Sequence, residues 1–250
     1  MSLAGRGVLV TRPLGQSARL MALLADAGAR PEPFPLLRIE PCPDALDALP
    51  AAATAADWLV FVSPSAIDIA WPRLAPLALR ARLATVGAAS AAVLARHSGR
   101  PVLYPTAASD SAALLALPEF ADPAGLDIVV VRGGGERGEP MATLRARGAT
   151  VSAADVYRRL DGDPDWERFD RLHAEGRLDA VVITSSEIAE RMFRLAGPAR
   201  GRTLQCLQYC VPHPRIAERL ASLGAARIVT TRADDAAIVA GLSEWFLHHP

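Results

Sequence analysis

The sequence contains two copies of one pattern. The segment Gly7–Arg12 (GVLVTR) reappears as Asp127–Arg132 (DIVVVR), 120 positions later. A second apolar segment, Asp57–Ser63 (DWLVFVS), reappears as Asp179–Ser185 (DAVVITS), 122 positions later. Because the spacing changes so little over a whole half, we interpret the chain as a duplicated unit with short insertions in its loops.

Each copy alternates short apolar segments with segments of helical character. The apolar ones are rich in Val, Ile and Leu, which is typical of strands buried on both faces of a parallel sheet. They cover 8–11, 57–62, 83–86 and 102–104, and then 128–131, 179–183, 209–211 and 228–230. Several intervening segments end in a glycine, as helices commonly do. The sequence therefore predicts an α/β fold with parallel sheets covered by helices.

One segment in each half departs from this rule. Residues 34–41 (FPLLRIEP) and 151–160 (VSAADVYRRL) alternate apolar with polar side chains, and prolines bracket the first. Such strands are half exposed and belong at a sheet edge or between domains. We expect them to be paired connectors between two lobes.

Composition excludes several classes of protein. The 27 basic residues, all of them Arg, balance 27 acidic ones, which argues against a nucleic-acid or membrane-surface partner. With no lysine, neither a Schiff base nor a P-loop lysine is available. Cys42, Cys206 and Cys210 have no metal or redox spacing, so we expect reduced thiols. We also see no signal peptide and no spanning segment, and expect a soluble cytoplasmic protein.

The candidate binding residues follow the predicted strands. In an open α/β sheet, ligands bind beyond the carboxyl ends of the strands, where helix N-termini present unpaired N–H groups. The turns there are rich in Gly, Ser and Thr, and either cap helices or form an anion-binding cleft. Taken together on both halves, they favour the cleft. The candidates are Thr11, Arg12, Ser63, Ser65, Gly87, Arg132, Gly133, Thr184, Ser185, His213 and Thr230.

Three other motifs carry weaker alternatives. Gly133–Gly138 satisfies G-x-G-x-x-G after a strand, and Asp155 follows at about 20 residues, as in dinucleotide sites. Glu136 would however place a carboxylate near the pyrophosphate. His213 is either a proton-transfer group or a rigid loop residue. Residues 161–165 (DGDPD) either hold a hard cation or form a solvated linker, and we favour the linker.

The motifs, in their order along the chain, resemble those of the uroporphyrinogen-III synthase family. They are 8–13 (VLVTRP), 34–41, 57–67 (DWLVFVSPSAI), 85–87 (TVG), 131–133 (VRG), 156–158 (VYR) and 179–188 (DAVVITSSEI). The resemblance implies two flavodoxin-like α/β lobes, internally duplicated and joined by a two-stranded β-ladder. Residues 1–35 and 163–250 would form one lobe and 42–150 the other. Residues 36–41 and 151–162 would be the ladder, with the cleft between the lobes. Without the resemblance, the repeats alone suggest tandem domains.

The resemblance also implies a reaction. The linear tetrapyrrole hydroxymethylbilane, which carries eight carboxylates, would close to uroporphyrinogen III with loss of water and inversion of ring D. An azafulvene and a spiro-pyrrolenine would be intermediates, and no metal or organic cofactor would take part. Tyr157 matches a cleft tyrosine that the family places near the leaving hydroxyl, so we expect it to donate a proton or hydrogen bond there. We expect a monomer. A transient contact with hydroxymethylbilane synthase is an alternative that the sequence does not decide.

Two alternatives from other classes remain. One is a non-catalytic two-lobed protein that binds a small anion and closes around it. The other is an enzyme that uses a nucleotide at Gly133–Gly138. Pro212-His213 and Arg232–Asp234 depart from the small or hydroxyl residues that the resemblance leads us to expect in those turns.

Overall fold

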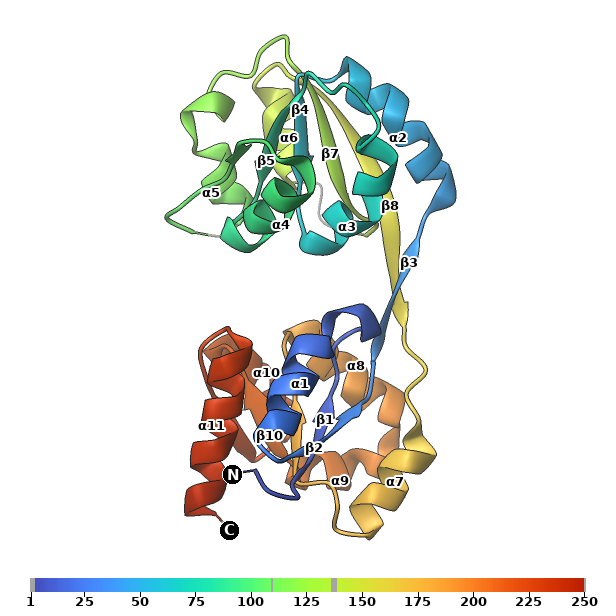
Figure 1. Cartoon of the computed structure of the whole chain (residues 1–250), viewed down its shortest axis with the longest axis vertical. Coiled ribbons are helices and arrows are strands. Elements are labelled where there is room, and N and C mark those ends of the chain that lie inside the picture. Colours follow the sequence, from blue (N-terminus) through green and yellow to red (C-terminus); the bar gives the residue numbers. More distant parts are fainter. Residues whose placement is uncertain (1–2, 109, 136–138, 250) are drawn as a thin grey trace. The chain divides into compact units, whose positions relative to one another are not determined.

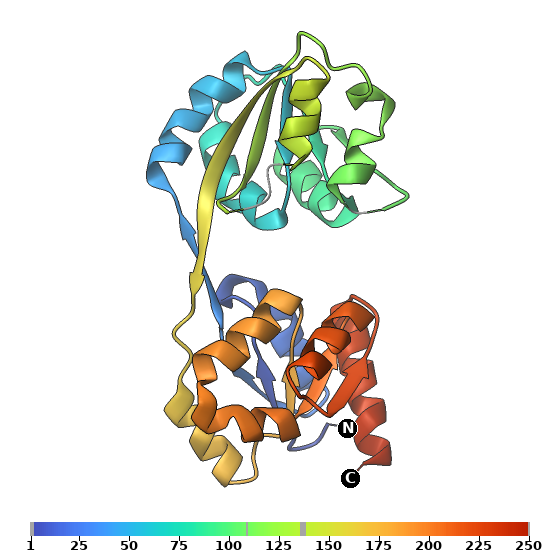
Figure 2. The ribbon, with the colours of Figure 1, turned by 180° about the vertical axis from the view of Figure 1, so that it is seen from behind.

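The computed structural model describes residues 3–108, 110–135 and 139–249. The chain divides into two compact units: unit 1 comprises residues 1–38 and 160–250, and unit 2 comprises 39–159. Each unit is one parallel-dominated sheet with helices on both faces (Figures 1 and 2). The α/β fold that the sequence predicts is confirmed. Among the helices of these ranges, none combines the length and the hydropathy that a membrane-spanning helix needs.

Unit 1 contains the five strands of sheet A, in the order β11-β10-β9-β1-β2. Its first part contributes β1 (Gly7–Val10), η1 (Leu14–Gln16), α1 (Ala18–Asp26) and β2 (Arg30–Pro33). The second part contributes α7 (Trp166–Ala174), β9 (Ala180–Val182), α8 (Ser186–Ala196), η3 (Pro198–Arg200), α9 (Gly201–Cys206), β10 (Gln208–Val211), α10 (Pro214–Ser222), β11 (Arg227–Thr230) and α11 (Asp235–His248).

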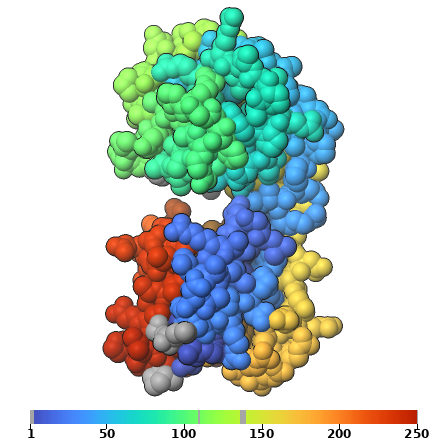
Figure 3. All heavy atoms as spheres, viewed as in Figure 1, coloured from blue at the N-terminus to red at the C-terminus, as the bar shows by residue number. Residues whose placement is uncertain are grey.

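Unit 2 is built on sheet B, whose strand order is β3-β8-β7-β4-β5-β6. The strands are β3 (Leu37–Pro41), β4 (Trp58–Phe61), β5 (Arg82–Thr85), β6 (Val102–Leu103), β7 (Asp127–Gly133) and β8 (Thr150–Asp161). The helices are α2 (Pro43–Ala55), α3 (Pro64–Leu74), α4 (Ala88–Ser98), α5 (Ser111–Leu115), η2 (Pro118–Phe120) and α6 (Glu139–Ala146). In Figure 3 the side chains of α3 and α4 lie on the surface of this unit.

The duplication is visible in the topology, and the two copies exchange their parts. Strand β1 pairs with β9, and its copy β7 pairs with β4, so each first strand lies beside a strand from the other half of the sequence. Aligned through the repeat, β2-β1-β9-β10-β11 and β8-β7-β4-β5-β6 have the same order. This is the flavodoxin-like order 2-1-3-4-5. The tandem arrangement that the repeats alone suggest is therefore absent from these strands.

Alternation of side chains along the strands places a core on each face of each sheet. In β4, Leu59 and Phe61 pack with α2, α3 and α4, whereas Trp58 and Val60 pack with α5 and α6. In sheet A, Leu9 packs with the core under α7, α8 and α10, and its neighbours Val8 and Val10 pack with α1 and α11. The short buried strands thus have two apolar faces, as their composition predicts.

The two half-exposed segments form strands that are neighbours in sheet B. At one end Cys42 N donates to Val156 O at 2.9 Å, and at the other Gly162 N donates to Leu36 O at 3.0 Å, so β3 and β8 run in opposite directions. The chain passes between the units twice, once within β3 and once within β8. Beyond this role, β8 is an integral strand of sheet B, because residues 150–157 pair with β7.

Candidate functional site

The candidate binding residues lie where parallel strands end. In unit 1 they follow or close β1, β9, β10 and β11, and in unit 2 they follow or close β4, β5 and β7. Because each set of strands is parallel, each set of turns occupies one edge of its own sheet. The structure therefore brings Thr11, Arg12, Thr184, Ser185, His213 and Thr230 to one edge of sheet A. It brings Ser63, Ser65, Gly87, Arg132 and Gly133 to one edge of sheet B.

The turn after β1 is tied into unit 1 by two side chains. Thr11 is fully buried, and its hydroxyl donates to Val182 O at 2.7 Å. Arg12 forms an ion pair with Asp235, 2.7 Å from Nη1 to Oδ1, and both side chains are largely buried. Thr11 thus joins β1 to β9, while Arg12 presents a cation that is already balanced by a carboxylate.

Ser63 and Ser185, which the repeat places at equivalent positions, cap equivalent helices. Ser63 Oγ accepts from Ala66 N at 3.2 Å, at the start of α3, and Ser185 Oγ accepts from Ile188 N at 3.2 Å, at the start of α8. Both have the extended backbone of a helix N-cap. Ser65 is half-buried in the first turn of α3. Gly87, also extended, precedes α4 and has no capping side chain.

The other unit 1 candidates are more open. His213 is exposed and caps α10, since its Nδ1 accepts from Arg215 N at 3.1 Å. This favours the rigid-loop interpretation over proton transfer. Thr184, Ser185 and His213 line one open hollow of about 590 Å³ that Arg215 and Glu187 also border. Thr230 is exposed at the end of β11.

In unit 2, the buried Tyr157 is the centre of a hydrogen-bonded cluster whose other members are half-buried. Its side chain is 0% exposed. The hydroxyl lies 3.2 Å from Ser63 Oγ and accepts from Arg159 Nη2 at 3.1 Å. The Arg159 guanidinium carbon lies 5.7 Å from the centre of the phenol ring. A charged donor and a helix-capping serine thus meet at the phenol oxygen.

A β-bulge places Tyr157 over Gly133. Along β7 and β8, Arg132 is opposite Asp155 but Gly133 is opposite Tyr157, so Val156 is the extra residue. A methyl group at position 133 would lie 2.5 Å from Tyr157 Cζ. Gly133 therefore makes room for the phenol, which is a structural reason for its place at the end of β7.

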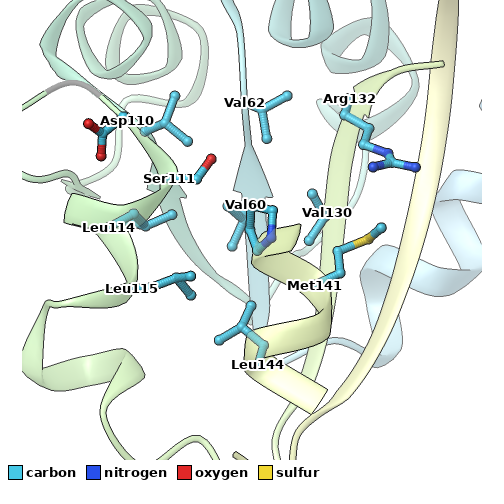
Figure 4. A pocket seen from close by; sticks show the side chains of 12 residues that line it. Val60, Val62, Asp110, Ser111, Leu114, Leu115, Val130, Arg132, Met141 and Leu144 are labelled. Carbon is cyan, nitrogen blue, oxygen red and sulfur yellow. The ribbon is translucent and has the colours of Figure 1, made fainter. Parts of the chain in front are cut away.

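Arg132 lies beside this cluster, next to a small apolar pocket. Its Nε donates to Asp155 Oδ1 at 2.7 Å, and the Arg132 side chain is largely buried. The pocket, of about 160 Å³, has Val60, Val130 and Leu144 among its walls, with Asp110 and Arg132 on opposite sides (Figure 4). The carboxylate that a dinucleotide site would direct to a ribose is thus bound to an arginine. Residues 136–138 of the glycine motif lie outside the described ranges.

The remaining motifs have structural partners. Asp161 binds Arg191 and Arg194, whose hydrogen bonds and charges lower its pKa, and Asp165 caps α7 by accepting from Arg168 N at 2.8 Å. Among the described residues, no group of three or more His, Cys, Asp or Glu could hold a metal ion. All three cysteines are free, and burial raises the pKa of Cys210 to about 12.

Two residues of these edges, Arg159 and Asp235, were not predicted from the sequence, and a third was predicted with another partner. Arg159 could have been found, because it follows Tyr157 by two positions on a strand and shares its face. The dinucleotide alternative assigns Asp155 to a ribose, whereas this carboxylate binds Arg132. Asp235 had no signal, since nothing in the sequence joins the start of α11 to the turn after β1.

Comparison with known proteins shows that the sequence is similar to one protein family. The profile described as "Uroporphyrinogen-III synthase HemD" matches residues 18–240. The uroporphyrinogen-III synthase of Escherichia coli K12 is 31% identical over 205 residues, which are 75% of this chain and 79% of that protein. The Salmonella typhimurium enzyme is 32% identical over 202 residues, with the same coverage.

Solved structures agree in fold. The mutant uroporphyrinogen III synthase of Thermus thermophilus superposes with a TM-score of 0.65 at 20% identity, over 98% of this chain and all of that one. The Helicobacter pylori uroporphyrinogen-III synthetase gives 0.59 at 15% identity, over 98% and 100%. Both similarities extend through both units.

Proposed function

The chain belongs to the uroporphyrinogen-III synthase family, and from that premise we propose that it closes hydroxymethylbilane to uroporphyrinogen III, with loss of water and inversion of ring D. The observation that carries this proposal is the family match over residues 18–240, which includes strands of both sheets. An identity of 31% to the Escherichia coli enzyme supports it. Such a reaction makes the protein a lyase.

In this reaction the enzyme must control which carbon of ring D forms the new bond, more than it must accelerate loss of the hydroxyl. Loss of the hydroxyl gives an azafulvene-like cation, and without an enzyme the linear tetrapyrrole then closes to the symmetric type I isomer. An enzyme favours the inverted product by holding the substituted carbon of ring D within attack distance of this cation. We propose that the site proceeds through a spiro-pyrrolenine, with no metal or organic cofactor.

The turns at the sheet edges are suited to a substrate with eight carboxylates. Helix N-termini and small residues offer backbone N–H groups to anions. Arg12 and Arg132, at duplicated positions in the two units, would add positive charge, reduced by Asp235 and Asp155. We propose substrate contacts at these arginines and at the turns of Ser63, Ser65, Gly87, Thr184, Ser185, His213 and Thr230. Thr11 and Gly133 would contribute through the backbone.

Tyr157 is the proposed proton source. As a phenol it is a weak acid near neutral pH, so its contribution is limited. Its contacts with Ser63 and Arg159, which are both partly exposed, support a role at the reacting end of the substrate. A monomeric state, a cytoplasmic location and a transient contact with hydroxymethylbilane synthase stay predictions.

The test supplies purified protein with hydroxymethylbilane generated in situ and separates the oxidised uroporphyrin isomers by chromatography, with and without chelator. We expect predominantly type III product, unaffected by chelator. Type I product at the rate of the blank would contradict the proposal. In that case a thermal shift with small anions, or with NAD and nucleotide sugars, distinguishes the anion-binding protein from the nucleotide-using enzyme.

A further inference from the structure

Three side chains of unit 2 form a chain of hydrogen bonds with a charged residue at one end. Arg159 Nη2 lies 3.1 Å from the Tyr157 hydroxyl, which lies 3.2 Å from Ser63 Oγ. Tyr157 is fully buried, whereas Ser63 and Arg159 are half-buried. A substrate therefore meets Ser63 or Arg159 before it meets the phenol.

The directions of these bonds follow from donor chemistry. A guanidinium has no acceptor, so Arg159 donates to the phenol oxygen. If Ser63 also donated to that oxygen, the buried phenol proton would have no acceptor in the described part of the chain, which costs free energy. The phenol must therefore donate to Ser63 Oγ.

The hydroxyl proton of Ser63 is then the one part of this side chain without a hydrogen-bond partner among the described residues. Its oxygen accepts from Ala66 N at 3.2 Å and from the Tyr157 hydroxyl, which fills both acceptor positions of a serine hydroxyl. Within the described ranges, no further bond engages its own proton. Since Ser63 is only half-buried, that proton is available to a substrate group that reaches the serine hydroxyl.

From this geometry we infer that Ser63 donates the proton to the leaving hydroxyl. The Tyr157 hydroxyl then replaces the proton that Ser63 has lost, and Arg159 positions the phenol. Ser63 is then the catalytic residue in contact with substrate, and Arg159 is a positioning residue. The inference rests on the proposed function and assigns the acid of the same reaction.

The proton balance closes without another reactant. As the carbon–oxygen bond of the hydroxymethyl group breaks, the Ser63 proton passes to the leaving oxygen, and water departs. The Tyr157 proton moves to Ser63 Oγ, and the phenolate is stabilised by the Arg159 guanidinium. The proton that the cyclised tetrapyrrole loses at the end restores Tyr157. One proton is thus taken up and one is returned per turnover.

The test measures kcat, KM and the solvent deuterium isotope effect for type III formation by the full-length protein. The variants are Ser63→Ala, Tyr157→Phe, the double variant, and Ser63→Thr, which keeps a hydroxyl. We expect each loss of a hydroxyl to lower kcat about 10²-fold, at the low end of the range of about 10²–10⁴ for positioned proton transfer. KM should change little. Ser63→Thr should retain most of kcat.

The double variant is the decisive measurement. In a relay, removal of either hydroxyl breaks the same path, so Ser63→Ala/Tyr157→Phe should be no slower than the slower single variant, and the isotope effect should fall equally in all three. Losses that multiply would overturn the inference, because they indicate two independent roles. A Ser63→Ala protein with near-normal kcat would overturn it as well.

Two controls separate chemistry from folding. Ser63→Ala also removes a helix cap, so Asp165→Ala, which removes the cap of α7, should lower Tm similarly and leave kcat unchanged. Arg159→Met should lower kcat and reduce the isotope effect while Tm stays near that of the parent. A parent protein that makes only type I product would contradict the proposed function itself, which is a distinct outcome.

Discussion

The phenol ring of Tyr157 occupies the place that a side chain would take at Gly133. A Cβ at position 133 would lie 2.5 Å from Cζ and 2.9 Å from the hydroxyl oxygen. At Gly134, the next residue, a Cβ would meet nothing closer than 3.6 Å, which is ordinary contact. The two adjacent glycines therefore differ sharply in the room that they have.

Gly133→Ala should displace the Tyr157 hydroxyl and lower both activity and stability. Overpacking of this kind costs about 1–3 kcal/mol in the free energy of unfolding. If Tyr157 acts as proposed, kcat should fall about as far as in Tyr157→Phe. Urea denaturation and the isomer assay measure the two effects. Gly134→Ala is the matched control, and an equal loss in both variants would contradict the steric explanation.

Asp235→Asn should strengthen substrate binding. Asp235 neutralises Arg12 across 2.7 Å, so its replacement leaves the Arg12 charge for the carboxylates of the substrate. We expect KM to fall by a factor of about 2–5 at low ionic strength, and the gain to shrink in about 0.5 M salt through screening, as Coulomb attraction at a partly exposed site allows.

The control for this prediction is Asp170→Asn. Asp170 also binds an arginine, Arg200, at 2.6 Å, but on α7 and η3 rather than at the carboxyl edge of sheet A. Its replacement should leave KM unchanged. A fall in KM in both variants would indicate a general effect of net charge.

Asp161 should make stability depend on pH in the acid range. Hydrogen bonds and attraction from Arg194 and Arg191 lower its pKa in the folded state below the ordinary value of 3.8. A lowered pKa stabilises the fold above the unfolded-state value, and this contribution is lost as the pH falls through the folded-state value. Asp161→Asn should therefore give a small decrease in Tm at pH 7 that disappears on acidification.

The control is Asp163→Asn, which changes the same charge two residues away at an exposed position. Thermal unfolding of both variants between pH 7 and pH 2 checks the prediction. A Tm difference for Asp161→Asn that grows toward low pH would have the wrong sign for a carboxylate with a lowered pKa.

The sequence predicted the buried strands but not the edge strand β2. The buried strands were predictable because Val, Ile and Leu at both faces leave a continuous apolar run. Strand β2 has the sequence RPEP, and two prolines in four residues disfavour a strand. They are tolerated because β2 is the last strand of sheet A, pairing only with β1 in the described sheet, so missing N–H groups can face outward.

The candidate site was predictable in its positions but not in its pairings. Which turn follows which strand can be counted along the chain, so the edge residues were found. The partner of Arg12 is Asp235, more than 200 positions away, and only the folded sheet brings α11 to that turn. Likewise, the bulge at Val156 decides that Tyr157 rather than its neighbour faces Gly133.

The exchanged topology predicts which fragments of the chain fold alone. Residues 39–159 contain β4–β7, most of β8 and both apolar clusters of unit 2, so this fragment should unfold cooperatively in urea. Residues 160–250 lack β1, which lies between β9 and β2 in sheet A, and should not fold alone. Addition of a peptide of residues 1–38 should restore a cooperative transition, since it supplies β1, β2 and α1.

A cut at residue 120, where a tandem division of the repeats would place it, is the matched control. It separates β4 from β7, which pair over four residues in the middle of sheet B, and β1 from β9 in sheet A. Because each half then loses a central strand partner, neither 1–120 nor 121–250 should show cooperative unfolding by circular dichroism. A cooperative transition in either half would mean that the tandem unit is stable by itself and that the exchange is not required for folding.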